Sequence, residues 1–212
     1  MGNHRGSIPP PSDNNYIFVE EYIMKWFTSD LHLGHENLLN KGYRGNYFCS
    51  IQEHDEIILN NLLNSLKSGD NLYLLGDIFW KNEYPTMKKL FIFLEKNNIK
   101  YYYIRGNHEP KNLIVDPLNQ YETLSVHTEK GLLFLCHYPM LTWNQSHRNS
   151  IQLHGHIHMN DSTYCKLRTN RNILPPGKRI NVNVEFWNFY PVSLPQIIEK
   201  ANTLPDNWDC IK

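Results

Sequence analysis

Short apolar runs recur along this chain, and stretches with helical periodicity lie between them. Four of the runs are rich in aromatic and leucine side chains, which is the composition of strands buried inside a sheet. These four runs span residues 25–29, 71–75, 100–104 and 132–136. A shorter run at 151–153 leads into a segment rich in histidine. Residues 180–184 alternate apolar and polar side chains, which predicts one further strand.

Amphipathic helices are predicted between these strands. Within residues 51–66, apolar side chains fall at helical spacing, and residues 87–94 repeat apolar positions at i, i+3, i+4 and i+7. Ser193 and Gln196 form a capping-box pattern, so a short helix should follow and run to about Ala201. Helices that cover a sheet made of such strands indicate an α/β protein.

The length of 212 residues is most simply explained by one domain with a sizeable core. We expect residues 24–212 to form that domain. Residues 1–23 are rich in Pro, Gly, Ser and Asn, which predicts a flexible N-terminal extension or a tag.

Composition argues against several kinds of partner. The 21 basic side chains balance 21 acidic ones, so the formal net charge of zero favours neither nucleic acid nor an anionic membrane. No apolar run approaches the roughly 20 residues of a membrane span, and no signal peptide opens the chain. The four cysteines lie far apart without a C-x-x-C pair, which favours reduced thiols. We therefore expect a cytoplasmic protein without a membrane partner.

Side chains that bind metals follow five of the predicted strands directly. In chain order they are Asp30 and His32, Asp77, Asn107, His137, and His156 with His158. Open α/β sheets place their sites outside the carboxyl ends of strands, so these side chains are expected to meet. Imidazole, carboxylate and amide oxygen together suit divalent cations. Each motif alone is also typical of a turn or a helix cap, but five at equivalent positions favour a shared metal site.

The segment Gly155-His156-Ile157-His158 shows how two ligands can converge. Histidines two residues apart on a straight strand would point to opposite faces of the sheet. A sharp backbone turn at Gly155 would instead direct both imidazoles at a metal. Asp77 also follows a glycine, and its two carboxylate oxygens could be divided between two cations.

These motifs, taken in order, resemble those of the calcineurin-like metallophosphoesterases. The resemblance covers about residues 25–200 and rests on Asp30-x-His32, Gly76-Asp77, Gly106-Asn107-His108-Glu109, His137 and Gly155-His156-x-His158. The sequence around the motifs is similar to the small bacterial and bacteriophage-encoded members. This similarity lies in two stretches, Ser29-Asp30-Leu31-His32-Leu33-Gly34-His35 and Asn183-Val184-Glu185-Phe186-Trp187-Asn188 with Pro191-Val192-Ser193. Glu109 is a departure, because the family usually has an aspartate there that supports the neighbouring histidine.

The resemblance implies a fold and a metal centre. The implied fold is a four-layer α/β/β/α sandwich, in which two mixed sheets face each other and helices flank them. The implied cofactor is a pair of divalent ions chosen from Mn, Fe, Zn or Co, with Mn expected to support activity in vitro. By the family pattern, Asp30, His32 and His158 hold the first ion. Asn107, His137 and His156 hold the second, and Asp77 bridges the two.

The implied activity is hydrolysis of a phosphate ester. Two cations roughly 3.5–4 Å apart lower the pKa of a shared water, so that a metal-bridging hydroxide attacks phosphorus. The cations also neutralise the charge that develops on the phosphate. His108 would assist the leaving group with a proton or a hydrogen bond. His35, Arg44 and Arg105 are candidate substrate-binding residues, with loop or structural roles as the alternative.

The sequence leaves the substrate open. A short chain without room for a cap domain and a basic segment at 160–179 favour a phosphodiester of nucleotide type, such as a cyclic nucleotide or a nucleic-acid end. The alternatives are a phosphomonoesterase or protein phosphatase, and a non-catalytic binding module on the same fold. Such modules usually lack a metal ligand or the catalytic histidine, and this chain has both. A β-lactamase-like enzyme is disfavoured because the H-x-H-x-D-H cluster is absent. Nothing in the sequence fixes the oligomeric state.

Overall fold

The computed structural model describes residues 23–40, 44–80, 84–109, 115–158 and 175–210. The expected N-terminal extension, apart from Ile23, lies outside these ranges. So do residues 160–174 of the basic segment that the sequence analysis connected with the substrate.

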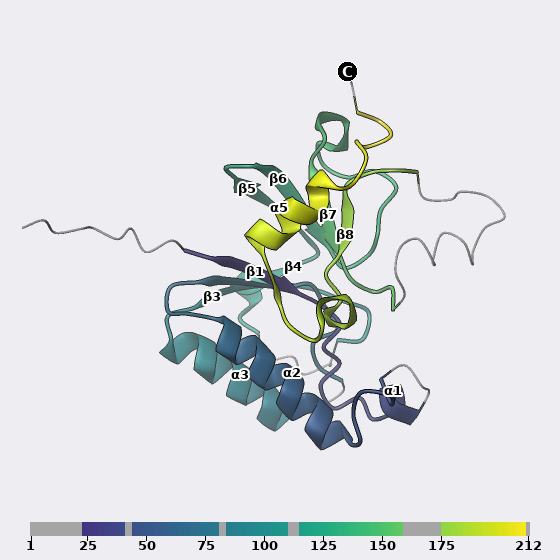
Figure 1. Cartoon of the computed structure of the whole chain (residues 1–212). Helices are drawn as coiled ribbons and strands as arrows, with labels where there is room; N and C mark the ends of the chain where they lie inside the picture. The colour runs from purple at the N-terminus through teal and green to yellow at the C-terminus, as the bar shows by residue number, and fades with distance from the viewer. Residues whose placement is uncertain (1–22, 41–43, 81–83, 110–114, 159–174, 211–212) are drawn as a thin grey trace, which may run out of the picture.

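Two mixed β-sheets form the centre of the molecule (Figure 1). The first sheet has the order β4-β3-β2-β1-β9, and its strands are β1 Lys25–Thr28, β2 Asn71–Leu74, β3 Lys100–Ile104, β4 Gln120–Tyr121 and β9 Val192–Ser193. The second has the order β5-β6-β7-β8, with β5 Thr123–Thr128, β6 Gly131–Cys136, β7 Ile151–His154 and β8 Arg179–Asn181. In each sheet one outer strand, β9 or β5, is antiparallel to parallel neighbours.

Helices flank the sheets, as the α/β prediction requires. The longest are α2 Ile51–Ser65, α3 Tyr84–Lys96 and α5 Leu194–Asn202, and the shorter ones are α1 Asn37–Asn40, η1 Pro117–Asn119, η2 Ser146–Arg148 and η3 Val184–Trp187. Helices α2 and α3 lie side by side on the outer face of the first sheet, at the bottom of Figure 1. Helix α5 contacts β1, β8 and β9, where its apolar side chains close the space between the sheets. The prediction of an α/β fold with two mixed sheets and flanking helices is confirmed.

Strand β2 shows why the apolar runs have no polar alternation. Leu72 and Leu74 belong to the core beneath α2 and α3, whereas Tyr73 and Leu75 belong to the core between the two sheets. Successive side chains on a strand point to opposite faces, so a strand covered on both faces must be apolar throughout. The ring of Tyr73 stacks on the ring of Phe27 in β1 at a centroid distance of 4.9 Å.

The sequence predicted most elements but not all of their ends. The predicted helices at 51–66 and after Ser193 correspond to α2 and α5, and α5 carries the predicted capping box. The predicted strand at 180–184 is wrong in its second half, because β8 ends at Asn181. The side chain of Asn181 accepts a hydrogen bond from the Asn183 amide, and Asn183 caps η3. The backbone of residues 182–184 bonds instead to Ser29 after β1, so the chain leaves the second sheet here and meets the first.

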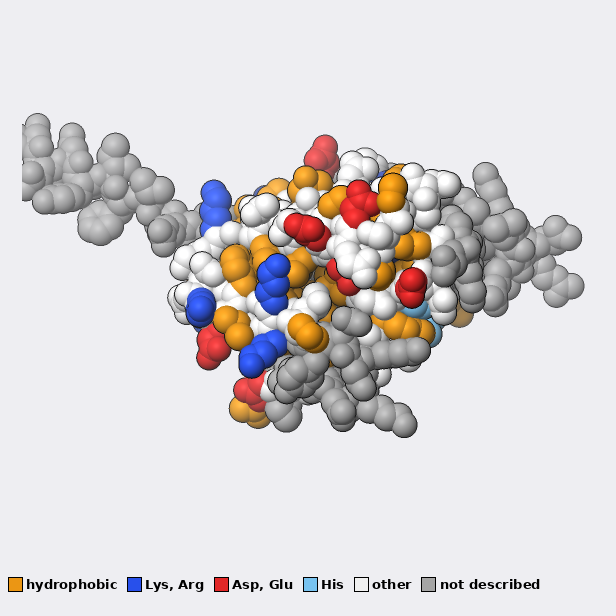
Figure 2. Space-filling model, turned by 90° about the horizontal axis from the view of Figure 1, so that it is seen from below, with side chains coloured by type: hydrophobic (Ala, Val, Ile, Leu, Met, Phe, Trp, Pro, Cys, Tyr) orange, Lys and Arg blue, Asp and Glu red, His pale blue; other side chains and the backbone are white. Residues whose placement is uncertain are grey.

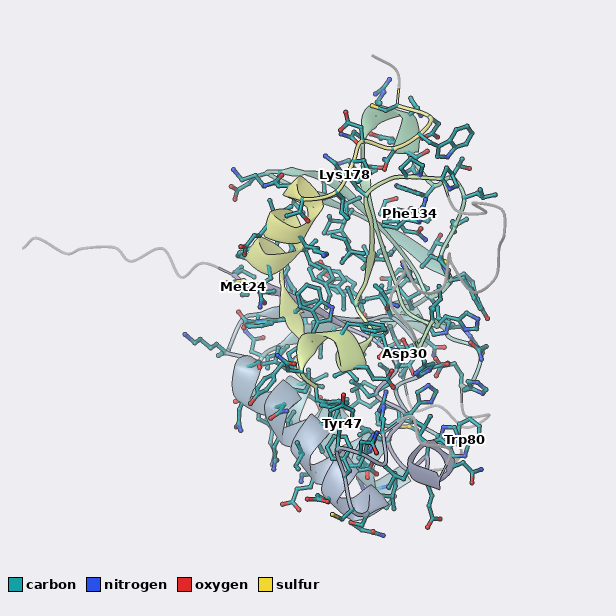
Figure 3. The ribbon with its side chains drawn as sticks, turned by 45° about the vertical axis from the view of Figure 1, so that its right-hand side comes forward. Met24, Asp30, Tyr47, Trp80, Phe134 and Lys178 are labelled. Carbon is teal, nitrogen blue, oxygen red and sulfur yellow. The ribbon has the colours of Figure 1, made fainter. Side chains whose placement is uncertain are left out.

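The outer surface and the junction of the sheets differ in character. Figure 2 views the molecule from below, from the side where α2 and α3 lie in Figure 1, and basic and acidic side chains are mixed on that face. Asp30 lies instead at the junction between the two halves of the molecule, as Figure 3 shows. Asp30 is fully buried, so the strand ends at this junction enclose an acidic side chain, whereas the charged side chains of the outer surface face solvent.

Candidate metal centre

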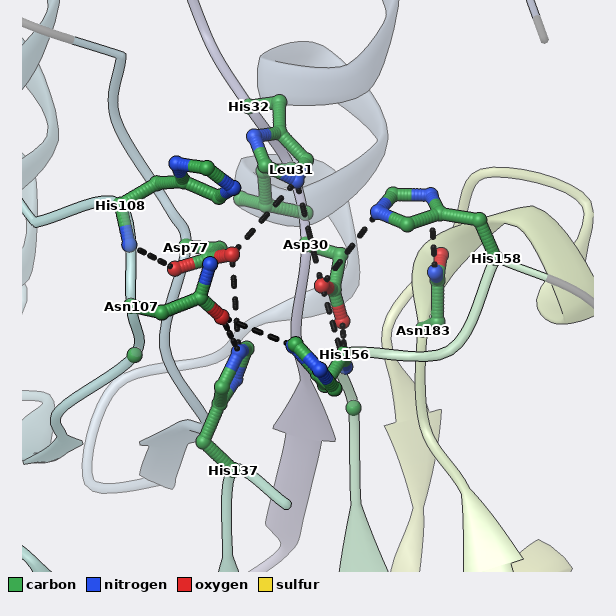
Figure 4. Close-up of polar contacts among 12 residues, drawn as sticks. Asp30, Leu31, His32, Asp77, Asn107, His108, His137, His156, His158 and Asn183 are labelled. Atoms are coloured by element: carbon green, nitrogen blue, oxygen red, sulfur yellow. Dashed lines mark hydrogen bonds and ion pairs between the residues drawn. The ribbon is translucent and has the colours of Figure 1, made fainter. Parts of the chain in front are cut away.

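Every predicted metal ligand lies just beyond the carboxyl end of a strand, and the strands come from both sheets. Figure 4 shows the seven side chains around one centre. From the first sheet, β1 leads to Asp30 and His32, β2 to Asp77, and β3 to Asn107. From the second sheet, β6 leads to His137, and β7 leads to His156 and His158. Parallel strands in both sheets therefore bring residues far apart in the sequence to one place.

Four of these seven residues have an unusual backbone conformation. The φ angle is +55° at Asp30, +50° at His32, +54° at Asp77 and +68° at His156. Residues with a Cβ atom pay roughly 1–2 kcal/mol in this left-handed region, and such strain gathers at functional sites. Strands β1, β2 and β7 are therefore each followed by an abrupt turn at the candidate ligands. The turn predicted at Gly155 is made by His156 itself.

The glycines of the motifs are required by close approach. A Cβ atom on Gly155 would lie 2.3 Å from Oδ2 of Asp30, and one on Gly106 would lie 2.2 Å from Oδ1 of Asp77. Gly76 has a φ of +83°, and a Cβ atom there would lie 2.6 Å from Cα of Gly106. The backbones of neighbouring strand ends thus lie directly against the two carboxylates, and any larger residue would displace them.

Asp30, His32 and His158 form one group that could hold a cation. Oδ1 of Asp30 lies 3.9 Å from Nε2 of His32 and 3.7 Å from Nε2 of His158. The Asp30 carboxylate is fixed by the backbone amide of His156, which donates to Oδ1 at 3.1 Å and to Oδ2 at 3.0 Å. The three side chains therefore converge without bonding directly to one another.

A second group consists of Asp30, Asp77 and His137. Oδ2 of Asp77 lies 3.5 Å from Nε2 of His137 and 3.8 Å from Nε2 of His32, so this oxygen lies between the two groups. Oδ1 of Asn107 lies 3.0 Å from Nε2 of His137 and 2.8 Å from Nδ1 of His156. Asn107 and His156 thus adjoin the second group.

The nitrogens of His32 test whether these residues fit a metal. His32 is almost fully buried, and neither of its ring nitrogens has a hydrogen-bond partner among the described residues. A buried polar atom without a partner is costly, and in native proteins it calls for an explanation such as an ion. Burial also holds the pKa of His32 well below its usual range, so the ring is a neutral imidazole, the form that binds metal. The donor set and this orphaned ring fit a divalent cation.

The carboxylates give the site a strong attraction for positive charge. Burial raises the pKa of Asp30. Burial acts the same way on Asp77, but hydrogen bonding and the charge of His137 outweigh it and lower the pKa of Asp77 to about 2. Burial opposes a charge on His137, yet Asp77 raises the pKa of its imidazole. A metal cation bound in place of the His137 proton would balance the negative charge of the same carboxylates.

Glu109 supports the site in a different way from the role that the resemblance implies for its position. Its Oε1 accepts hydrogen bonds from the amides of Asp77 at 3.0 Å and Gly106 at 2.8 Å, and Oε2 accepts one from the hydroxyl of Tyr103 at 2.5 Å. The carboxylate therefore ties the end of β2 to the end of β3. Burial raises the pKa of Glu109.

His108 lies at the open side of the centre. Its side chain is exposed, and its backbone amide donates to Oδ1 of Asp77 at 2.8 Å. The ring centroid lies 5.7 Å from that of His32 and 5.0 Å from that of Trp80. His35 stacks on Trp80 at a centroid distance of 3.6 Å, so the predicted substrate residue His35 belongs to an aromatic wall beside His108.

Arg44 requires a correction. The sequence analysis assigned it to the substrate, but its side chain is fully buried and offers no surface to a ligand. Its guanidinium pairs with Oε1 of Glu185 at 2.7 Å and donates to the backbone carbonyls of Asp30 and Leu31. Arg105, also predicted to contact substrate, is half-exposed and lies 3.7 Å from Glu122.

Three residues near the centre were missed by the sequence analysis. Oε1 of Glu185 lies 3.0 Å from Nδ1 of His158, the Asn183 side chain lies 3.4 Å from the same nitrogen, and His54 contacts Arg44. Glu185 and Asn183 stand in a stretch that did carry the family resemblance, so that stretch was the available signal. His54 sits on α2, and only the fold brings it to the site.

Comparison with known proteins agrees with this geometry. A sequence model of the family described as calcineurin-like phosphoesterase matches residues 25–188. The uncharacterized protein MJ1445 of Methanocaldococcus jannaschii is 30% identical over 177 residues, which cover 82% of this chain and 89% of that protein. The crystal structure of AQ665, a protein of unknown function from Aquifex aeolicus, has a TM-score of 0.58 and 23% identity, and covers 84% of this chain and 99% of that one. The last similarity concerns the fold alone.

Proposed function

Because the chain belongs to the calcineurin-like phosphoesterase family, we propose that it hydrolyses phosphate esters at a centre of two divalent metal ions. The preferred substrates in this proposal are phosphodiesters of nucleotide type. The observation that carries the proposal is the pair of adjoining ligand groups that meet at the buried carboxylates of Asp30 and Asp77. Two adjoining groups, each with carboxylate and imidazole, are what a dinuclear site requires.

The seven residues divide the task of holding the ions. Asp30, His32 and His158 would hold one ion, and His137, Asn107 and His156 would hold the other. Asp77 lies between the groups and would contact both. Divalent ions bound there supply Lewis acidity, which polarises the phosphate and lowers the pKa of the attacking water. The ligand set lacks thiolate, so Mn, Fe, Zn or Co are all suitable, and Mn is our first choice for assays.

His108 is the proposed catalytic side chain. In the reaction a water oxygen forms a bond to phosphorus while the bond from phosphorus to the leaving oxygen breaks. The leaving oxygen gains negative charge, and His108 donates a proton or a hydrogen bond to it. Its exposed ring beside the ligand groups supports this role, since a leaving group must reach solvent.

The burial of Arg44 supports a diester over a monoester. A phosphomonoester carries close to two negative charges near neutral pH, whereas a diester carries one. Arginine is a common partner for such a terminal phosphate. Of the two arginines predicted to contact substrate, Arg44 pairs with Glu185 and Arg105 lies beside Glu122. His35 and Trp80 line the His108 side and would suit an aromatic or heterocyclic leaving group.

The test is a panel of aryl monoesters, aryl diesters, cyclic nucleotides and dinucleotides, assayed with Mn and after chelation. We expect Mn-dependent hydrolysis with diesters cleaved faster than monoesters. The variant Asp77→Asn, prepared identically, controls for contaminating phosphatases. Faster cleavage of monoesters would refute the substrate preference. Two bound Mn ions without any hydrolysis would refute the activity and leave a binding module.

A further inference from the structure

A buried chain of polar contacts lies behind one half of the proposed centre. Arg44 is at its middle, with a fully buried side chain. Its Nε donates to Oε1 of Glu185 at 2.7 Å, and Nη2 and Nη1 donate to the carbonyls of Asp30 at 2.5 Å and Leu31 at 2.8 Å. A buried charge is costly unless it is paired and hydrogen-bonded, and here every arm of the guanidinium has an acceptor.

The contact with Glu185 fixes the tautomer of His158. Oε1 of Glu185 lies 3.0 Å from Nδ1 of His158, and an ionised carboxylate can only accept hydrogen bonds. Nδ1 of His158 must therefore carry the hydrogen. In the neutral ring, the form that binds metal, the lone pair is then on Nε2, which lies 3.7 Å from Oδ1 of Asp30. A carboxylate behind a ligating imidazole orients the ring and raises its basicity.

The same chain of contacts fixes the segment that carries His32. Arg44 can only donate, so Nε2 of His54, 2.8 Å from Nη1, accepts, and Nδ1 of His54 donates to Asp55 at 2.7 Å. The other carboxylate oxygen of Asp55 accepts from the amide of Gly34 at 2.8 Å. The backbone is thus bonded to Arg44 just before His32, at Asp30 and Leu31, and to Asp55 just after it, at Gly34.

The other half of the centre is supported independently. Nδ1 of His137 lies 2.7 Å from the backbone carbonyl of Leu75, and Nε2 lies beside Asn107. Nδ1 of His156 also lies beside Asn107. These supports are neutral groups at the ends of β2 and β3. Within the described part of the chain, no hydrogen bond of Arg44 or Glu185 reaches Asn107, His137 or His156.

We propose that the Arg44–Glu185 ion pair is a positioning device for one metal subsite, the one made by Asp30, His32 and His158. The ion pair sets the affinity of that subsite for its ion. It does not support the subsite of Asn107, His137 and His156, whose affinity is independent of it. Both residues act through others and touch no substrate. The inference rests on the proposed dinuclear centre, and it adds that the two halves are held by different means.

Metal titration of the full-length protein tests the inference. The wild type, Glu185→Gln, Asn107→Ala and the combination of both are titrated with Mn by calorimetry, and Mn electron paramagnetic resonance distinguishes coupled pairs from single ions. We expect two ions in the wild type and one tightly bound ion in each single variant. In Glu185→Gln the lost subsite should bind about 10–100-fold more weakly. The combined variant should retain neither ion with the original affinity.

Controls separate this result from general instability. Asp206→Asn removes a carboxylate from an exposed ion pair with Lys178 and should bind both ions as the wild type does. If Glu185→Gln fails to fold, Arg44→Lys replaces it, because lysine keeps the charge but lacks the planar fork that serves four acceptors. Equal weakening of both subsites, or of neither, in a protein whose wild type binds two ions would overturn the inference. A wild type that binds fewer than two ions would instead refute the proposed centre.

Discussion

At the scale of single residues, two buried aspartates a few ångströms from the same histidines have opposite electrostatic surroundings. Burial raises the pKa of Asp30, so its charge in the metal-free protein is poorly compensated. Asp77 is also buried, but His137 and the amide of His108 lower its pKa to about 2. Asp30 is therefore a site where function is maintained at a cost in stability, and Asp77 is not.

This difference predicts opposite effects for two matching substitutions in the chelated protein. Asp30→Asn should raise the free energy of unfolding near pH 7 by about 1 kcal/mol, a typical size for one residue. The melting temperature should rise by about 2–4 °C in a chain of this length. Asp77→Asn should lower the free energy of unfolding and the melting temperature by similar amounts. Asp77→Asn should weaken the binding of both Mn ions, and Asp30→Asn should weaken the binding of at least the ion that it helps to hold. Calorimetric melting with and without chelator measures this, and equal signs for both variants would contradict it.

The pH dependence of the chelated protein follows from the same two pKa shifts. The folded pKa of Asp77 lies below its unfolded value of roughly 3.9, so its stabilisation is present above pH 4 and is lost as the pH falls toward 2. The folded pKa of Asp30 is raised, so its destabilisation decreases as the pH falls below that value and is gone below the unfolded pKa. Asp77→Asn should flatten the loss of stability between about pH 4 and pH 2. Unfolding by urea at a series of pH values measures it, and an unchanged slope would argue against a lowered pKa.

His108→Ala separates the proposed chemistry from metal binding. The ring of His108 lies beside the two candidate ligand groups but belongs to neither of them. The variant should keep two Mn ions and lose about 10²–10⁴-fold in turnover, the range for a general acid. Metal analysis is made on the same samples as the assay. His147→Ala, at an exposed histidine of η2, is the control and should behave as the wild type. Unchanged turnover with full metal content would remove His108 from the mechanism.

The sequence predicts the types of ligand better than it predicts their support. Aspartates, histidines and an asparagine directly after apolar runs could be found by their position alone. The role of Arg44 could not, because its partner Glu185 is 141 residues away in the sequence. An arginine in a polar segment looks the same whether it meets a substrate or a buried carboxylate. Only the packing of β1, α2 and η3 decides between these roles.

At the scale of elements, the turns after the strands determine the geometry of the site. Four ligand residues occupy the left-handed region, and neighbouring glycines allow backbone to lie against the carboxylates. Hydrophobic pattern predicted β1, β2, β3, β6 and β7 because these strands are covered by other elements. It did not predict β5, whose exposure alternates, or β9, which has two residues. It also misplaced the end of β8, because residues 182–184 leave the second sheet and form a bridge with Ser29 at the end of β1.

Gly155→Ala and Gly69→Ala test how close approach differs from backbone strain. A methyl group on Gly155 would meet the Asp30 carboxylate at 2.3 Å and must displace it. Gly69 has a φ of +87° with nothing within 4 Å, so alanine there is only strained. We expect Gly155→Ala to weaken Mn binding at least tenfold. Gly69→Ala should cost about 1–2 kcal/mol of stability and leave Mn binding unchanged. Calorimetric titration and melting decide, and normal Mn affinity in Gly155→Ala would contradict the geometry.

At the scale of the whole molecule, the candidate ligands come from both sheets. The first sheet supplies both aspartates, and the second supplies His137, His156 and His158. The core between the sheets consists of apolar side chains such as Leu75, Leu135 and Leu153. It ends where the polar candidate ligands begin. None of the described helices has the length and apolar content needed to cross a bilayer. A single domain at 24–212 and a cytoplasmic location stay predictions.

Because ions at the junction would connect the two sheets, metal should stabilise the whole fold. A ligand that binds only the folded state at 100 times its dissociation constant adds about 2.7 kcal/mol. For a chain of this size that is about 5–10 °C in melting temperature for one site. Stability should therefore rise with Mn concentration in the wild type and rise less in Asp30→Asn, which loses a ligand of one ion. Hydrogen exchange should slow at the ends of β6 and β7 as well as β1 and β2. If Mn slowed exchange in only one sheet, the ions would not connect the two sheets. The ligands would then have to be assigned differently to the two ions.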